Sequence, residues 1–192
     1  MRRIFLLSAI LALPLLSFAQ FNLKPHLGGN YGQLQGNVIS STFRSKPGYQ
    51  LGLDVSYGYR FYVEAGLEYT YIPTEVTVIN GPTFDLSASA IRIPLLVGFR
   101  FFDNEDFNIR LWGGASTSYV MNVNGFELIT KDDINSPIWG VTAGVGVDYQ
   151  DFYLEAGYEI GVSRVFDKSV DPNGVKNNVV YVNLGYYIFR YH

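Results

Sequence analysis

The chain has 192 residues, a net charge of −3 at neutral pH and no cysteine. The mildly acidic balance, without any run of lysine or arginine, excludes the electrostatic footprint of a nucleic-acid-binding protein. The lack of cysteine excludes disulfides and thiolate metal sites. Aromatic residues make up 16% of the chain, a share that is high for a soluble domain.

The N-terminus has the three parts of a secretory signal peptide. Two arginines precede an apolar run from Ile4 to Leu16, and Ser17-Phe18-Ala19 forms a small-x-small cleavage site. The apolar run is shorter than the roughly 20 residues that a transmembrane helix needs. We therefore expect residues 1–19 to be a cleaved signal peptide and residues 20–192 to form one exported domain.

After the signal peptide, apolar and polar residues alternate in one segment after another. In the second segment Tyr49, Leu51 and Leu53 point one way, whereas Gln50 and Asp54 point the other. This period of two predicts β-strands with one apolar and one polar face. No segment has the spacing of an amphipathic helix over a useful length. We expect eight strands, at about residues 21–33, 47–59, 61–72, 88–101, 107–121, 138–149, 152–164 and 179–190.

The connections between these strands alternate in length. Short turns are expected at residues 59–61, 102–106 and 150–151, and long loops at residues 34–46, 73–87, 122–137 and 165–178. Short turns at one end and long loops at the other are typical of outer-membrane barrels. An even number of strands lets the first pair with the last, which leaves no open edge in lipid. The predicted fold is all-β, an eight-stranded antiparallel up-and-down transmembrane β-barrel.

The placement of charge decides which face of the barrel meets lipid. The apolar face carries no charged residue on the third, fourth and sixth strands. Enclosing the charged face in the apolar cup of a soluble ligand-binding barrel would cost several kcal/mol per unpaired ion. We expect Glu68 to lie opposite Arg92 in a packed structural network, with a selectivity filter as the functional alternative. The predicted lumen residues are Asp54, Glu64, Glu68, Arg92, Arg100, Arg110, Asp148, Glu155 and Glu159.

Histidine placement argues against an enzyme. His26 and His192 are the only histidines, and both are expected near the short turns, away from the long loops. A nucleophile at the outer rim would therefore have no histidine base within reach. The acids near Asp171 are read as formers of a turn. We expect no catalytic residue, no metal and no cofactor.

Two long loops carry residues that could contact a partner. Alternation within 73–87 and 122–137 suggests that strands continue beyond the membrane as a raised sheet, whose exposed edge could bind a partner strand. The alternative is that these loops only shield the barrel. The candidate contact residues are Val76, Val78, Phe84, Phe126 and Leu128.

Several strands resemble those of one family. Residues 91–101, Ile-Arg-Ile-Pro-Leu-Leu-Val-Gly-Phe-Arg-Phe, resemble the R-I-P-L-L strand of the PorT-like or "porin family" outer-membrane barrels. Residues 111–116, 139–149 and 152–158 are similar to later strands of that family. Two departures are Gly157, where many members have arginine, and the ending at His192 in place of a terminal aromatic residue. The resemblance implies a barrel similar to OmpA or OmpX, and a few members serve protein secretion.

These observations together predict a protein of the cell outer membrane with a structural or interaction role. The barrel would be the anchor and the long extracellular loops the contact surface. The expected partners are outer-membrane lipid, the outer-membrane assembly machinery and a possible protein partner bound through the loops, with no nucleic acid. A narrow conduit for small solutes or ions and an accessory component of protein secretion are the alternatives.

Overall fold

The computed structural model describes residues 21–35, 41–78, 82–104, 106–125, 134–165 and 174–188. The expected signal peptide lies outside these residues. The described part of the chain contains no helix that is long and apolar enough to cross a membrane. Its strands are β1 (Phe21–Gln35), β2 (Ser41–Ser45), β3 (Pro47–Gly58), β4 (Phe61–Val78), β5 (Thr83–Asp103), β6 (Phe107–Asn124), β7 (Ile138–Tyr149), β8 (Phe152–Gly161) and β9 (Lys176–Tyr186).

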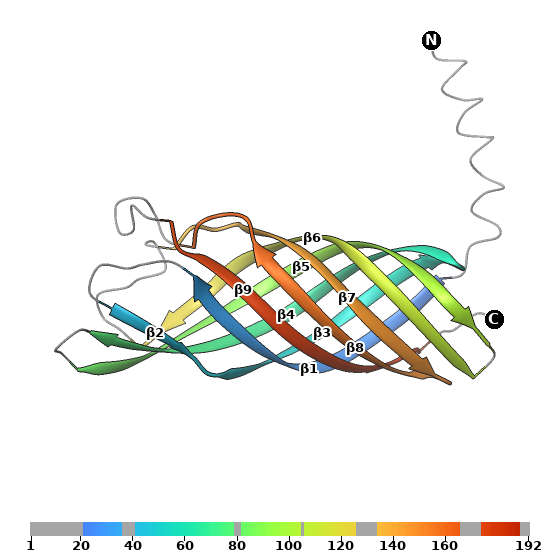
Figure 1. Ribbon diagram of the computed structural model, residues 1–192, viewed down its shortest axis with the longest axis horizontal. Helices are drawn as coiled ribbons and strands as arrows, with labels where there is room; N and C mark the ends of the chain where they lie inside the picture. The colour runs from blue at the N-terminus through green and yellow to red at the C-terminus, as the bar shows by residue number, and fades with distance from the viewer. Residues whose placement is uncertain are drawn as a thin grey trace, which may run out of the picture.

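The sheet closes on itself. Its strands follow the order β2-β4-β3-β1-β9-β8-β7-β6-β5, and a further pairing of β4 with β5 joins the two ends. All the pairings are antiparallel. Within the described residues β2 pairs only with β4, so the other eight strands make up the barrel (Figure 1). The predicted eight-stranded antiparallel barrel is thus confirmed.

Three short turns lie at one end of the barrel, which we call the short-turn end. They join β3 to β4, β5 to β6 and β7 to β8. Gly58 at the first turn has a φ of 124°, and a Cβ there would lie 2.3 Å from the Phe61 carbonyl oxygen, so the turn requires glycine. Phe21 at the start of β1 pairs with Tyr57, so the first strand begins at this end. We call the opposite end the long-loop end.

One predicted loop is largely strand. Residues 73–87 were expected to form a long loop, but β4 continues to Val78 and β5 begins at Thr83, with Thr77 paired to Thr83. β2 pairs with Thr74–Val78 along the side of this extension. The alternation of Glu75, Val76 and Thr77 continues the pattern of the barrel strand, so the hairpin keeps its ladder past the rim. We call β2, residues 74–78 and residues 83–86 the raised sheet.

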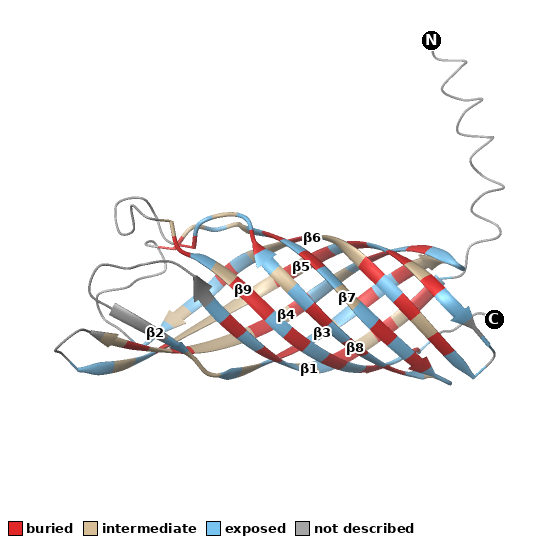
Figure 2. Ribbon diagram, in the orientation of Figure 1, coloured by how far each residue is buried: buried red, intermediate tan, exposed pale blue. Residues whose placement is uncertain are grey.

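Burial alternates along much of each barrel strand, with exposed apolar residues and buried polar ones (Figure 2). On β4 the apolar residues Val63 and Leu67 are 53% and 57% exposed, whereas Glu64 and Glu68 are 5% and 4% exposed. This is the reverse of a soluble barrel. It is the arrangement expected of a barrel that faces lipid on the outside and encloses its charges.

Aromatic rings in the lumen lie across glycines of the adjacent strand. A Cβ at Gly98 would lie 2.1 Å from Cζ of Tyr62, and one at Gly185 would lie 2.2 Å from Cζ of Tyr153. The strand register places each such ring opposite its glycine. The pairs are Tyr62 with Gly98, Tyr153 with Gly185 and Tyr181 with Gly157. The missing side chains therefore make the space in which these rings pack.

Candidate functional site

One group of charged residues crosses the lumen in its short-turn half, and we call it the Lys24 layer: Lys24, Glu64, Arg110, Asp148 and Glu155. The Lys24 ammonium lies 2.6 Å from Glu64 Oε2 and 3.1 Å from Glu155 Oε1. Arg110 Nε donates a hydrogen bond to Asp148 Oδ1 at 2.9 Å. Its Nη2 lies 2.5 Å from Glu155 Oε1, an ionic contact without hydrogen-bond geometry. All five residues are buried, so the layer links β1, β4, β6, β7 and β8 across the interior.

Tyrosine rings cover the cations of this layer. The Lys24 ammonium lies 4.7 Å from the centre of the Tyr153 ring, and the Arg110 guanidinium lies 5.2 Å from the same centre. The Tyr187 hydroxyl donates a hydrogen bond to Asp148 Oδ2 at 3.2 Å. A cation over an aromatic face is stabilised by the ring quadrupole, which partly replaces the water that the charge has lost.

A second group, the Arg92 layer, lies closer to the long-loop end and consists of Arg92, Glu68, Glu159, Ser116 and Tyr181. The Arg92 guanidinium contacts Glu68 Oε2 and Glu159 Oε2, each at 2.7 Å. Ser116 donates a hydrogen bond to Glu159 Oε2 at 2.6 Å. The guanidinium also lies 5.0 Å from the centre of the Tyr181 ring. Glu68 is paired with Arg92 in the strand register, as the sequence pattern predicted.

Arg100 fits one part of the expectation and departs from another. It lies on the same lumen wall as Arg110, its partner in the strand register, as predicted, but it was also expected to face the acids of the neighbouring strands. The structure instead turns its guanidinium toward the short-turn end, where it donates hydrogen bonds to the carbonyl oxygens of Gly58 and Tyr59. It also lies 4.8 Å from the centre of the Tyr62 ring. Arg100 therefore holds the turn between β3 and β4 through two of its carbonyl oxygens.

Two lumen residues were missed by the sequence reasoning. His26 was expected toward the short-turn end but was not assigned to the lumen, where its side chain is fully buried, 3.1 Å from Asp54. Lys24 was not assigned to the lumen, although it is the cation that joins two acids. The alternation of Asn22, Lys24, His26 and Asn30 on β1 is the signal that places them inside.

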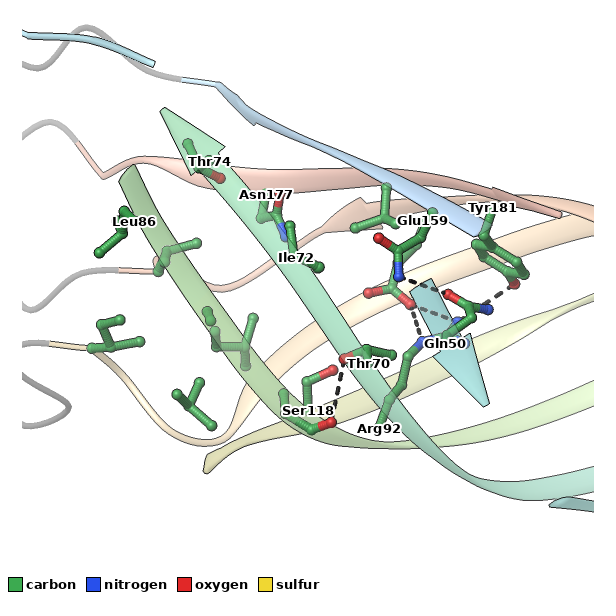
Figure 3. Close-up of a pocket in the computed structure, with 18 residues that line it drawn as sticks. Gln50, Thr70, Ile72, Thr74, Leu86, Arg92, Ser118, Glu159, Asn177 and Tyr181 are labelled. Atoms are coloured by element: carbon green, nitrogen blue, oxygen red, sulfur yellow. Dashed lines mark hydrogen bonds and ion pairs between the residues drawn. The ribbon is translucent and has the colours of Figure 1, made fainter. Parts of the chain in front are cut away.

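A cavity of about 110 Å³ lies between the Arg92 layer and the long-loop end. Figure 3 shows Gln50, Arg92, Glu159 and Tyr181 gathered at one side of the cavity, with Leu86 toward the other. The wall beyond this polar floor is mainly apolar. Its apolar residues are Ile72, Leu86, Ala88, Ala90, Val120, Ile134, Ile138, Val165 and Val179. The cavity is therefore lined mainly by apolar side chains, and the Arg92 layer forms its floor.

The raised sheet presents a polar face to solvent. Glu75 pairs with Asp85 and with Arg44, so the three side chains share one face. Lys46 forms an ion pair with Asp85, which raises the pKa of the Lys46 ammonium above its usual value, chiefly through the hydrogen bond to the carboxylate. The exposed surface here is charged, in contrast to the apolar contact surface that the sequence suggested.

The predicted contact residues differ in their exposure to solvent, and some lie outside the described residues. Val76 is 4% exposed and Phe84 is half-buried, because even-numbered residues of this hairpin point inward. The prediction that Val76 contacts a partner is therefore wrong, since its side chain is buried. Val78 ends β4, and its side chain is not among those described. Phe126 and Leu128 lie outside the described residues. β2 covers the edge of β4 in the raised sheet, and among the described residues β2 pairs with no second strand, so the expected sheet edge lies on β2.

Solved structures share this fold. The outer-membrane protein OprG of Pseudomonas aeruginosa aligns with a TM-score of 0.57 and 13% identity, over 90% of this chain and 97% of that one. Neisserial surface protein A aligns with a TM-score of 0.51 and 12% identity, over 85% and 96% of the two chains. No curated protein matches the chain in sequence. At these identities the likeness concerns the fold alone.

The sequence model of the family described as "Outer membrane protein beta-barrel domain" matches residues 4–187. This match covers nearly the whole chain, and it agrees with the closed barrel, the apolar outer surface and the enclosed charges. The chain therefore belongs to the outer membrane protein β-barrel domain family and is a lipid-embedded protein of the cell outer membrane.

Proposed function

We propose that the protein is an anchor with an interaction role, which presents its raised sheet to a partner and does not pass solutes. One observation carries this proposal: the Lys24 layer and the Arg92 layer fill the lumen between the short-turn end and the cavity. An eight-stranded barrel has an interior just wide enough for side chains to fill it. The part that can meet another molecule is therefore the long-loop end.

The alternative of a narrow conduit is tested by electrical recording. The purified protein in a planar bilayer should show no ion conductance above that of a lipid-only bilayer, because two layers of paired side chains occupy the lumen. Discrete channel openings that scale with the amount of inserted protein would reject the anchor proposal and support the conduit.

The interaction role is tested at the raised sheet. A photo-crosslinking residue at position 85, whose side chain is 80% exposed, should give a discrete crosslinked product in intact cells. The same residue at position 104, in a turn at the short-turn end, is the matched control and should not give that product. A variant in which Thr74–Leu86 is replaced by Asn-Gly should keep the barrel, but cells that carry it should show the same envelope defects as cells that lack the protein. Cells with this variant that behave like cells with the parent protein, or equal crosslinking at positions 85 and 104, would contradict the proposal.

We propose further that the chain is a PorT-like member of its family, on the strength of residues 91–101, and a secretion accessory is the alternative form of its interaction role. Removal of residues 1–19 during export and insertion by the outer-membrane assembly machinery are parts of the same proposal. A non-enzymatic role is supported by His26, whose ring nitrogens have no hydroxyl partner among the described residues. N-terminal sequencing of the membrane-inserted protein should begin at Gln20.

A further inference from the structure

Three buried side chains from three strands converge between the Lys24 layer and the Arg92 layer. His26 lies on β1, Asp54 on β3 and Glu68 on β4, and one ligand atom from each lies within 4.8 Å of the other two. The side chains of His26 and Asp54 are 0% and 4% exposed. The cluster combines an imidazole with two carboxylates inside the barrel. Glu68 also pairs with Arg92, whereas His26 and Asp54 take no part in the ion pairs of the two layers among the described residues.

Glu68 accepts a hydrogen bond from Arg92, but three other polar atoms of this cluster have no hydrogen-bond partner among the described residues. Neither ring nitrogen of His26 and not Oδ1 of Asp54 has a hydrogen-bond partner among the described residues. The approach of His26 Nδ1 to Asp54 Oδ2 at 3.1 Å lacks hydrogen-bond geometry. Buried polar atoms in folded proteins are nearly always bonded, so atoms left over in a group point to something that they bind.

The charges of the lumen are also unbalanced. The acids facing the interior in the described strands are Asp54, Glu64, Glu68, Asp148, Glu155 and Glu159, whereas the fixed cations are Lys24, Arg92, Arg100 and Arg110. With every one of these carboxylates ionised and His26 neutral, the carboxylates exceed the cations by two. Within the part of the chain that the structure describes, Asp54 forms an ion pair with His26 alone. A divalent cation at this cluster would supply the two missing positive charges where they are needed.

Two glycines allow the three side chains to meet. A Cβ at Gly52 would lie 2.7 Å from both Glu68 Cγ and His26 Cε1. A Cβ at Gly66 would lie 2.0 Å from Asp54 Oδ1. Gly52 is the register partner of both His26 and Glu68, and Gly66 is the partner of Asp54. The absence of these two side chains therefore gives the cluster its room.

We propose that His26, Asp54 and Glu68 bind one divalent transition-metal ion, for which zinc is the representative. Imidazole nitrogen and carboxylate oxygen are ligands that zinc takes in proteins. The ion joins β1, β3 and β4 inside the barrel and neutralises the excess carboxylate charge. Its role is structural, and it is independent of the contact made by the raised sheet.

The test uses the chain without a histidine tag, refolded metal-free into detergent micelles, given Zn²⁺ and dialysed. Metal analysis should find one zinc ion per chain. His26→Gln and Asp54→Asn should each weaken zinc affinity by more than about tenfold, since each removes a ligand. His192→Gln, which alters the only other histidine of the chain, is the matched control and should bind zinc like the parent protein.

Two results would overturn the proposal. The first is zinc uptake by the parent protein no greater than that of the two ligand variants. The second is loss of zinc in His192→Gln. If the ligand variants do not fold, the visible absorption spectrum of Co²⁺ added to the parent protein tests the proposal instead. An intense visible absorption of four- or five-coordinate cobalt supports the site, and the weak spectrum of hydrated cobalt contradicts it. Neither result depends on crosslinking at the raised sheet, so the two proposals fail separately.

Discussion

Individual charged residues inside the barrel are stabilised by neighbours from several strands. Lys24 illustrates this, because its ammonium contacts two carboxylates and lies over Tyr153 while its side chain is 1% exposed. A buried ion pair adds little net stability relative to apolar packing, but removing one partner leaves the other charge buried and unpaired. Removing one charged residue from the lumen is therefore expected to destabilise the barrel through the partner that is left unpaired.

We expect Lys24→Met to lower the free energy of unfolding by about 3–5 kcal/mol, because Glu64 is left buried with no cation in contact. Urea unfolding in phospholipid vesicles, followed by the fluorescence of the two tryptophans, measures the change. Lys46→Met is the matched control, since its ammonium is exposed and its removal should leave the unfolding midpoint unchanged. An equal loss in both variants would show that burial of the pair is not the cause.

Neighbouring strands fit together through large and small residues placed opposite each other. On β8 and β9, Tyr153 lies over Gly185, and the ring is 1% exposed between the cations of the Lys24 layer. The ring cannot move without disturbing Lys24 and Arg110, which pack against its face. A lumen glycine such as Gly185 is therefore needed because its missing side chain leaves space for an aromatic ring.

Gly185→Ala should destabilise the barrel by about 1–3 kcal/mol, because the new methyl group overlaps the Tyr153 ring. Gly113→Ala is the matched control, since a Cβ there would meet its nearest atom at 3.6 Å, an ordinary contact. The stabilities of the two variants are compared through their midpoints of urea unfolding. If Gly113→Ala lost as much stability as Gly185→Ala, the packing explanation would be wrong.

The whole molecule is organised by its solvent, with apolar residues outward and charges inward. Leu67 lies within the apolar band of β4 and is 57% exposed. Water cannot satisfy a charge at such a position, because lipid tails surround it. The same lipid requires the sheet to close, since every backbone group in it must find a partner within the protein.

We expect Leu67→Arg to lower the free energy of folding into vesicles by about 2–4 kcal/mol, the cost of an arginine near the bilayer midplane. Thr83→Arg, on the raised sheet, is the matched control and should fold like the parent protein. The folded fraction is read on gels from the difference in migration between boiled and unboiled samples. Equal folded fractions for both variants would mean that residue 67 does not face lipid.

The sequence by itself determined the barrel, its inside and outside, and the pairing of Glu68 with Arg92. These follow from alternation, turn chemistry and charge placement, which are local patterns that neighbouring strands must obey. Alternation also suggested the extension of β4 and β5 past the rim. Only the tertiary structure decided that β2 pairs with this extension and that Arg100 binds a turn. It also brought His26 to Asp54. Contacts of this kind join residues from separate strands, and they depend on barrel closure and on the room left by glycines such as Gly52, which no single strand reveals.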